Sequence, residues 1–371
     1  MKIGINASFL RKPATGIGQV ALNYLKTLNE YPQNSKYFVY TEGENNLKLG
    51  DNFIKKNFLP PYKRDDLIRK IWWEKICLPK KVKQDECQAF ISLYQCPTIF
   101  SKNIKHTMVV HDIIPKIFPE YLNNWRKKIY WKLTERAIKR ADKIIAISKH
   151  TKNDLIKYLK ITTEKIEVRY LDVDPIYKKE ISENESGRVL KKYNLKKGYI
   201  YCGGGLEKRK NVEILLKAYK TLKKSQTRGG EIPKLVISGK LMPELAPLVT
   251  DVEKLVKKNG LENDVKLLDF VPQEDLPSLY KNAKIFVYPS FYEGFGLPVL
   301  EAMNCGVATI CAKTSSLPEV GGEAVLYFDS SDERDLADKI KLFLDNENLR
   351  QTYIKKGKVQ AKKFLWKNFI R

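Results

Sequence analysis

The stretch of chain that decides the fold is Lys284-Ile285-Phe286-Val287-Tyr288-Pro289-Ser290-Phe291-Tyr292-Glu293-Gly294-Phe295-Gly296-Leu297-Pro298-Val299-Leu300-Glu301-Ala302. It opens with a short apolar run, rich in β-branched and aromatic residues, which is typical of a strand buried on both faces. Two glycines then provide a turn without Cβ atoms, and Pro298 suits the first position of a helix, where its missing N–H costs nothing. We therefore predict a buried strand, a tight turn and a short helix that ends at Gly306.

Two carboxylates, Glu293 and Glu301, stand on either side of this turn. The unpaired N–H groups and the positive dipole end of the helix would lie between them, and both favour phosphate. Gly294 and Gly296 would let the backbone approach such a ligand closely. The alternative is that Glu301 only complements the helix dipole and that Glu293 is a solvated turn residue. The arrangement as a whole favours a phosphate-bearing ligand.

Length and composition narrow the class of protein. A chain of 371 residues, 43% of them hydrophobic, can bury the cores of two domains. Its formal net charge of +25 predicts an anionic partner, and nucleic acid, a nucleotide or an anionic membrane surface would each fit. The alternative is that the lysines simply form solvated faces. The six cysteines show no zinc spacing, and no apolar run resembles a leader or a membrane span, so we expect reduced thiols in a cytoplasmic protein.

Strand-like and helix-like segments alternate in both halves of the chain. This alternation predicts an α/β fold with doubly wound, mostly parallel sheets, whose ligands lie at the carboxyl ends of the strands. A charged, irregular stretch at 172–197 separates the halves, so we expect two domains that face a central cleft. The expected strands are 3–6, 37–40, 90–93, 107–110, 143–147, 199–202, 234–238, 265–268, 284–288, 308–311 and 325–327, and the expected helices include 19–28, 151–159, 211–222, 245–259, 276–282 and 348–371.

A second candidate site follows the strand expected at 199–202. Gly203-Gly204-Gly205 would let the backbone approach a ligand, and Arg209 and Lys210 would supply fixed positive charge for a diphosphate. The glycine spacing is neither the dinucleotide fingerprint nor a Walker loop. The alternative is an ordinary basic turn in which Asn211 caps the next helix.

Four further features lie in the first half and the linker. Gly16-Ile17-Gly18 forms a glycine loop after the first strand, and His111 ends a strand and would project into the cleft, although either feature also occurs without a ligand. The basic segment 69–81 fits an anionic membrane surface or a core-facing helix with a wet basic side, and we favour the second. Asp172-Val173-Asp174 falls in the linker, so we expect no metal there.

Together these residues resemble the retaining GT-B glycosyltransferases of family 4, the group 1 glycosyltransferases, and especially their mannosyltransferase-like branch. The resemblance spans nearly the whole chain, and its blocks occur in the family's order at 3–18, 110–112, 141–148, 207–211, 293–301 and 316–320. The two glutamates with seven residues between them are the specific signal, whereas glycine loops are common. The resemblance implies two Rossmann-like domains: an acceptor domain at 1–177, completed by a C-terminal helix at about 356–371, and a nucleotide-sugar donor domain at 178–355.

The resemblance also implies roles for the acidic block. Glu301 would bind the ribose hydroxyls, and Glu293 would bind hydroxyls of the transferred sugar. Phe295, Gly296 and Leu297 would offer backbone N–H groups.

By the same resemblance, Arg209 and Lys210 would neutralise the diphosphate of the donor. Many family members carry an arginine where this chain has Gly204, so more of the leaving-group charge would rest on those two cations. Asp269 and Val271 would border the base.

In the first domain, Gly16, Ile17 and Gly18 would close over the phosphates. His111 would contact the donor sugar near the reacting carbon. Asn6 stands where an acidic residue is common in the family.

The implied reaction moves a hexose, with mannose favoured, from a nucleotide-diphosphate sugar to a glycan or a lipid-linked glycan. We expect retention of configuration, GDP-mannose as the first candidate donor ahead of UDP-hexoses, no metal or other cofactor, and a peripheral place at the inner face of the membrane. A sugar-nucleotide epimerase on the same fold is the alternative. A basic nucleic-acid-binding protein is more distant, and we expect no nucleic-acid partner because carboxylates would stand in its binding cleft.

Overall fold

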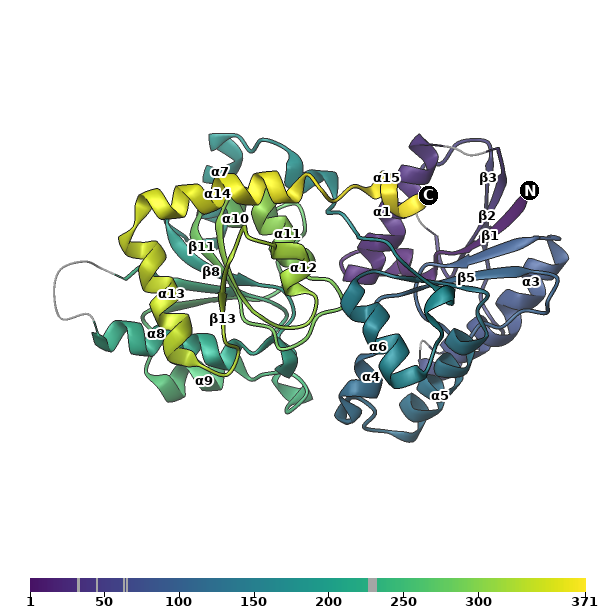
Figure 1. Ribbon diagram of the computed structural model, residues 1–371, viewed down its shortest axis with the longest axis horizontal. Helices are drawn as coiled ribbons and strands as arrows, with labels where there is room; N and C mark the ends of the chain where they lie inside the picture. Colours follow the sequence, from purple (N-terminus) through teal and green to yellow (C-terminus); the bar gives the residue numbers. More distant parts are fainter. Residues whose placement is uncertain (32–33, 45, 63, 65, 226–231) are drawn as a thin grey trace. The chain divides into compact units, whose positions relative to one another are not determined.

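The structure is a computed structural model that describes residues 1–371 except 32–33, 45, 63, 65 and 226–231 (Figure 1). The chain divides into two compact units. The first contains Met1–Leu171 together with Leu365–Arg371, and the second contains Asp172–Phe364.

The first unit is built on a seven-stranded parallel sheet in the order β3-β2-β1-β4-β5-β6-β7. The order reverses between β1 and β4, and the carboxyl ends of strands at such a reversal are where open α/β sheets bind ligands. The strands are β1 (Lys2–Asn6), β2 (Lys36–Thr41), β3 (Phe53–Asn57), β4 (Ala89–Ser92), β5 (Lys105–Val110), β6 (Lys143–Ala146) and β7 (Ile166–Val168). The helices are α1 (Gly16–Glu30), α2 (Leu67–Trp72), a π-helical turn (Trp73–Cys77), α3 (Leu78–Gln84), α4 (Ile114–Ile117), α5 (Trp125–Arg140), α6 (Lys149–Leu159) and α15 (Trp366–Ile370).

The second unit has a six-stranded parallel sheet in the order β10-β9-β8-β11-β12-β13. Here the order reverses between β8 and β11, and the quoted stretch supplies β11. The strands are β8 (Tyr199–Gly203), β9 (Leu235–Ser238), β10 (Val265–Leu268), β11 (Ala283–Tyr288), β12 (Ala308–Ala312) and β13 (Leu326–Phe328). The helices are α7 (Glu183–Tyr193), α8 (Val212–Ser225), α9 (Val252–Asn259), α10 (Leu276–Asn282), α11 (Leu297–Asn304), α12 (Leu317–Gly321), α13 (Glu333–Asp345) and α14 (Glu347–Ala361). The predicted α/β class, with two doubly wound parallel sheets, is confirmed.

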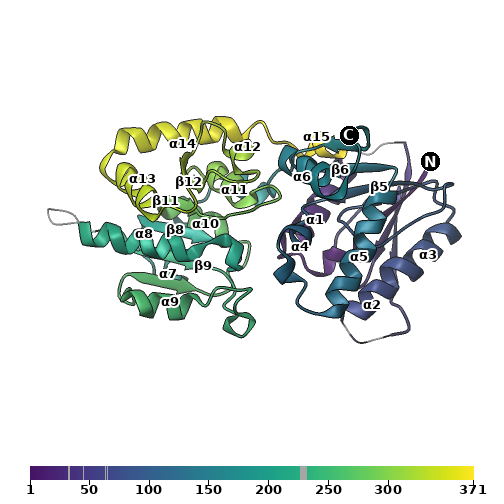
Figure 2. The same cartoon turned by 60° about the horizontal axis from the view of Figure 1, so that its bottom comes forward.

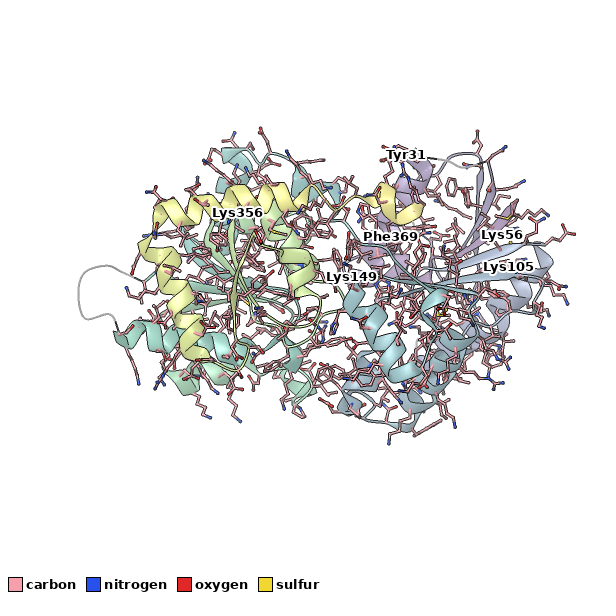
Figure 3. The ribbon with its side chains drawn as sticks, viewed as in Figure 1. Tyr31, Lys56, Lys105, Lys149, Lys356 and Phe369 are labelled. Atoms are coloured by element: carbon pink, nitrogen blue, oxygen red, sulfur yellow. The ribbon has the colours of Figure 1, made fainter. Side chains whose placement is uncertain are left out.

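The C-terminal segment returns to the first unit through α15. Phe369, labelled in Figure 3, is fully buried. Its ring meets that of Tyr24 on α1 edge-on, at 6.1 Å between centroids. The Arg169 guanidinium donates to the Phe369 carbonyl at 3.1 Å. The aromatic residues of this segment are therefore part of a core.

Several element boundaries differ from the prediction. Helix α1 begins at Gly16 rather than near Gln19, because the Thr15 hydroxyl caps it by accepting from the Gly18 N–H at 3.1 Å. Helix α9 begins at Val252, seven residues later than predicted, and β3 and β7 were not predicted at all. Among the described helices, none has the length and apolar character needed to cross a membrane.

Candidate functional site

A buried cluster in the second unit gathers around the carboxylate of Glu293, a residue that is 8% exposed. Four donors contact the same oxygen, Oε1: Lys210 Nζ at 2.7 Å, Arg209 Nη1 at 3.0 Å, the Tyr288 hydroxyl at 3.0 Å and the Ser290 hydroxyl at 2.6 Å. The two cations come from the turn after β8, and the other groups come from β11 and the loop after it. The cluster therefore lies at the strand-order reversal of this sheet.

Electrostatics favour an ionised carboxylate in this cluster. Burial alone would raise the pKa of Glu293, but the neighbouring Lys210 and Arg209 outweigh it and lower the pKa to about 2. Burial lowers the pKa of Lys210, and Glu293 opposes that shift. Arg209 Nη2 also lies 3.9 Å from Glu207 Oε1, so the two basic side chains of the cluster face two carboxylates.

The turn that carries the cations is held against the acidic block. The Phe291 N–H donates to the Arg209 carbonyl at 2.7 Å, and the Ser290 hydroxyl lies 3.1 Å from the same oxygen. Gly204 has a φ of +126°, which favours glycine, so the glycine run allows the sharp exit from β8 that brings this turn back. Gly239, after β9, lies so close that a Cβ there would be 2.4 Å from the Gly204 carbonyl oxygen.

The N-terminus of α11 has the features of an anion site. Gly296 is its N-cap residue with a φ of +112°, no side chain caps the helix, and Pro298 lies in its first turn. The preceding residues, Gly294 and Phe295, are buried, and Leu297 opens the helix. A positive dipole end without a capping side chain favours a bound anion.

Glu301 lies within α11 and is partly buried. The Tyr280 hydroxyl donates to its Oε2 at 2.8 Å. Burial raises the pKa of Glu301 to about 7, and the hydroxyls of Tyr280 and Tyr177 only partly oppose it. The two acids of the block therefore differ in pKa, because Glu293 faces cations and Glu301 faces tyrosine hydroxyls.

The residues predicted to border a base follow β10. Asp269 is exposed, and its Oδ1 accepts from the Leu241 N–H at 2.8 Å. Val271 is buried, and Phe270 between them is 56% exposed. An exposed aromatic ring here offers a surface on which a base could stack.

His111 belongs to the first unit and directly follows β5. Its ring is buried, with Nε2 2.9 Å from the Leu93 carbonyl oxygen. A carbonyl oxygen only accepts, so Nε2 carries the proton. Burial lowers the pKa of His111, so the ring is neutral at pH 7 and Nδ1 is its acceptor atom.

The glycine block of the first unit has a packing function. A Cβ on Gly18 would lie 2.1 Å from the Lys12 carbonyl oxygen, whereas a Cβ on Gly16 would meet nothing within 4 Å. The Gly18 N–H is already used by the Thr15 cap. Gly16 and Ile17 therefore carry the N–H groups of this block that remain for a ligand at the start of α1.

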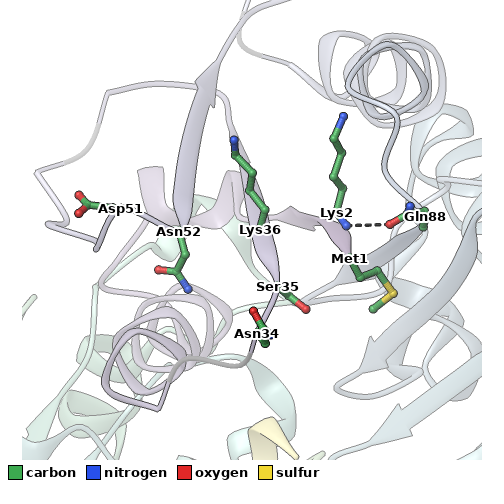
Figure 4. Close-up of a pocket in the computed structure, with 8 residues that line it drawn as sticks. All are labelled: Met1, Lys2, Asn34, Ser35, Lys36, Asp51, Asn52 and Gln88. Atoms are coloured by element: carbon green, nitrogen blue, oxygen red, sulfur yellow. Dashed lines mark hydrogen bonds between the residues drawn. The ribbon is translucent and has the colours of Figure 1, made fainter.

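A separate open pocket of about 560 Å³ lies at the opposite edge of the first sheet (Figure 4). Its lining includes Lys2 and Lys36, which start β1 and β2. Ligands of doubly wound sheets bind at the carboxyl ends of strands, so we do not assign this amino-end pocket to the function.

The sequence prediction missed the hydroxyl groups of the site. Tyr288, Ser290 and Tyr280 were not singled out, although each contacts one of the two acids. Ser290 stands three residues before Glu293, and that spacing was a usable signal. Tyr280 lies on α10, and nothing local links it to Glu301.

The linker acids make protein contacts. Asp172 pairs with Lys178 at 2.5 Å, and Asp174 caps the turn that follows by accepting from the Ile176 N–H. Across the part of the chain that the structure describes, no group of three or more potential metal ligands occurs.

Two models of known protein families together match most of the chain. The family model "Glycosyl transferases group 1" matches residues 185–360, and the model "Glycosyltransferase Family 4" matches residues 15–175. The Escherichia coli O-antigen chain mannosyltransferase B is 37% identical over 70% of this chain and 66% of its own length. The Escherichia coli serotype-specific mannosyltransferase WbdA is 33% identical over 71% of this chain but only 32% of its own length. The matched part thus covers about two thirds of one relative and a third of the other.

Solved structures share the fold at low sequence identity. WaaG, a glycosyltransferase involved in lipopolysaccharide biosynthesis, has a TM-score of 0.74 at 16% identity, with 98% of this chain and 95% of that chain covered. Anabaena HepE in complex with UDP-glucose has a TM-score of 0.72 at 16% identity, with 100% and 98% covered. The two sheets and these matches identify the fold as GT-B, and with both family models they show that the chain belongs to the group 1 glycosyltransferases of family 4.

Proposed function

We propose that this protein transfers mannose from GDP-mannose to a glycan or lipid-linked glycan, with retention of configuration and without a metal. The observation that carries the proposal is the Glu293 cluster, which holds Arg209 and Lys210 in place near an α11 N-terminus that lacks a capping side chain. The mannosyltransferase relatives support the choice of sugar. UDP-hexoses are the next candidate donors, since HepE has been solved with UDP-glucose.

The reaction needs groups that stabilise a departing diphosphate. Cleavage of the bond to the anomeric carbon leaves negative charge on the phosphate and positive charge on the sugar ring. Arg209, Lys210 and the helix end are fixed in place before the reaction, so they stabilise that charge with little reorganisation. The departing phosphate accepts the proton of the acceptor hydroxyl as the new bond forms on the same face of the sugar.

The other parts of the donor, which are the ribose, the transferred sugar and the base, contact other residues. Glu301 accepts hydrogen bonds from the ribose hydroxyls, and Glu293 accepts them from the transferred sugar. Asp269 and Val271 border the base. His111 of the first unit accepts through Nδ1 from a sugar hydroxyl.

We place Gly16, Ile17 and Gly18 of the first unit over the phosphates. Because Gly18 is capped by Thr15, Gly16 and Ile17 carry the N–H groups that contact the ligand.

A donor screen tests the assignment. GDP-mannose, UDP-glucose and UDP-N-acetylglucosamine are added in turn, with and without EDTA, and the midpoint of thermal unfolding is measured. We expect GDP-mannose to raise the midpoint most, equally in EDTA, and NMR of the product to show retained configuration. Conversion of the donor without any acceptor would instead establish the epimerase. Salt-dependent RNA binding with no response to any sugar nucleotide would overturn the proposal in favour of a nucleic-acid-binding protein.

We also place the protein in the cytoplasm, at the inner face of the membrane, where a lipid-linked acceptor would be found. The formal net charge of +25 supports attraction to anionic lipid.

A further inference from the structure

Helix α5 turns large apolar side chains toward solvent. Trp125 is 62% exposed and Ile129, one turn later, is 45% exposed. Lys128, Lys132 and Arg136 are exposed at spacings of three or four residues, so they continue the same stripe along the helix. The outer face of α5 is thus apolar at its N-terminal end and basic along its length.

The segment formed by α2, the π-helical turn and α3 repeats this pattern. Trp72 is 40% exposed and Ile76 is 57% exposed, and Lys75 and Lys80 are exposed beside them. In both segments an exposed Trp is followed by Lys three residues later and by Ile four residues later. The inner side of the segment packs in the core, as predicted, with Trp73 fully buried.

The two segments form one surface of the first unit. Helices α2 and α5 pack together, and Figure 2 shows them side by side. Tyr130 on α5 donates to Glu74 Oε2 in the π-helical turn at 3.0 Å. Glu74 is fully buried, so the acid of this turn is not exposed on the surface.

We infer that this surface, made of the exposed Trp and Ile pairs of both segments and the lysines beside them, binds a bilayer that contains anionic lipid. Trp side chains prefer the membrane interface, and Ile gains from burial among acyl chains. Lysines beside them are attracted to anionic headgroups. A nucleic acid would use the cations and the rings but gains nothing from exposed Ile side chains.

This inference deepens the membrane association proposed above, and its test needs no donor and no activity. Binding of the full chain to phosphatidylglycerol–phosphatidylcholine vesicles is measured by co-sedimentation, with phosphatidylcholine vesicles as the uncharged comparison. We expect binding to the mixed vesicles only. Equal binding to both, or to neither, overturns the inference.

The charge variant is Lys128→Gln with Lys132→Gln. Each basic side chain near an anionic surface contributes about fivefold in affinity, so the double change should weaken vesicle binding by roughly 25-fold. The matched control is Lys355→Gln with Lys356→Gln, two exposed lysines on α14 of the second unit; Lys356 is labelled in Figure 3. An equal loss in both variants means that only net charge matters, and it overturns the assignment of the surface.

The apolar variants separate a membrane from a polyanion. Trp125→Ser with Ile129→Ser should lower vesicle affinity at least tenfold, while Val359→Ser, a 64% exposed residue on α14, should not. Quenching of tryptophan fluorescence by brominated lipid should be reduced when Trp72 and Trp125 are both changed to Phe. Unchanged quenching contradicts insertion. Insertion is also contradicted if RNA displaces vesicles from the apolar variant as readily as from the wild type, because that response is the one expected of an unselective polyanion site. Transfer to a water-soluble acceptor should be unaffected, so loss of vesicle binding does not depend on the proposed reaction.

Discussion

Glu293 already holds the two cations that a departing diphosphate would need. Its Oε1 lies within 3.0 Å of both Arg209 and Lys210, and the hydroxyls of Tyr288 and Ser290 donate to the same oxygen. A buried carboxylate between two cations lowers the cost of keeping them charged away from water. Glu293 is therefore a positioning residue for the cations as well as the proposed ligand of the sugar.

Removal of one cation should impair turnover. Lys210→Ala leaves Arg209 alone beside Glu293, and the loss of one preorganised charge is expected to lower kcat by roughly a hundredfold or more. Steady-state transfer kinetics measure this. Lys208→Ala is the control, because Lys208 lies in the same turn but is exposed. Wild-type turnover in Lys210→Ala would remove the residue from the mechanism.

The Glu301 carboxyl should make nucleotide binding depend on pH. A carboxylate that accepts from two ribose hydroxyls must be ionised, and in the free protein its pKa is about 7. Below pH 7 a proton must leave on binding, so the Kd of GDP should rise by up to about tenfold per pH unit as pH falls, and it should level off above pH 7. Calorimetric titrations from pH 5.5 to 8.5 check the profile. Glu301→Gln should bind more weakly at pH 8 and show a flat profile, and a wild-type slope in that variant would place the titration elsewhere.

At the scale of elements, the turn before α11 depends on Gly296. Its φ of +112° disfavours any side chain, and a Cβ would lie 2.7 Å from Leu317 Cδ2. Gly296→Ala is expected to lower the free energy of unfolding by about 1 to 3 kcal/mol. Urea denaturation followed by near-ultraviolet circular dichroism measures it.

The comparison for that variant is Gly187→Ala, in the same unit. Gly187 lies within α7, where a Cβ meets nothing within 4 Å, so alanine should stabilise the helix by about 0.5 to 1 kcal/mol. Opposite signs are expected for the two glycine replacements. If both replacements change the free energy of unfolding in the same direction, backbone strain at Gly296 is not the cause of the lost stability.

Local sequence signals predicted most strands but not the two outermost strands of the first sheet, and helix α7 lies in the stretch that was expected to be irregular. β3 and β7 are edge strands, and only the first residue of each is buried. Their hydrophobic pattern is weak, because an edge strand is covered on fewer sides. The start of α1 was missed because Gly16 and Gly18 are poor helix formers, and the Thr15 cap outweighed them.

Among the side chains around the two acids, only the charged ones were predicted from the sequence. Acidic and basic residues indicate phosphate chemistry by their type. Tyr280 and Tyr288 are ordinary helix and strand residues, and their type indicates no function. Their contacts join elements far apart in the chain, or depend on which way a strand faces. Neither property is encoded in local spacing.

At the scale of the whole molecule, the first unit relies on a segment that follows the second unit in the chain. Phe369→Ala removes a fully buried ring and should lower the stability of the first unit by about 3 to 5 kcal/mol. Hydrogen exchange should show faster opening in 1–171 and no change in α8 or α13. Val359→Ala, at a residue 64% exposed, should change nothing measurable. Equal loosening of both units would contradict the assignment of α15 to the first.

The return of the chain through α15 also has a consequence for biosynthesis. In the gene the second unit is an insertion within the first, because Asp172–Phe364 is translated before Leu365–Arg371. A nascent first unit must wait on the ribosome, with Tyr24 lacking its Phe369 partner, until the whole second unit has been made. Separate expression of the first unit would therefore call for a rearranged gene in which the codons for 365–371 directly follow those for 1–171.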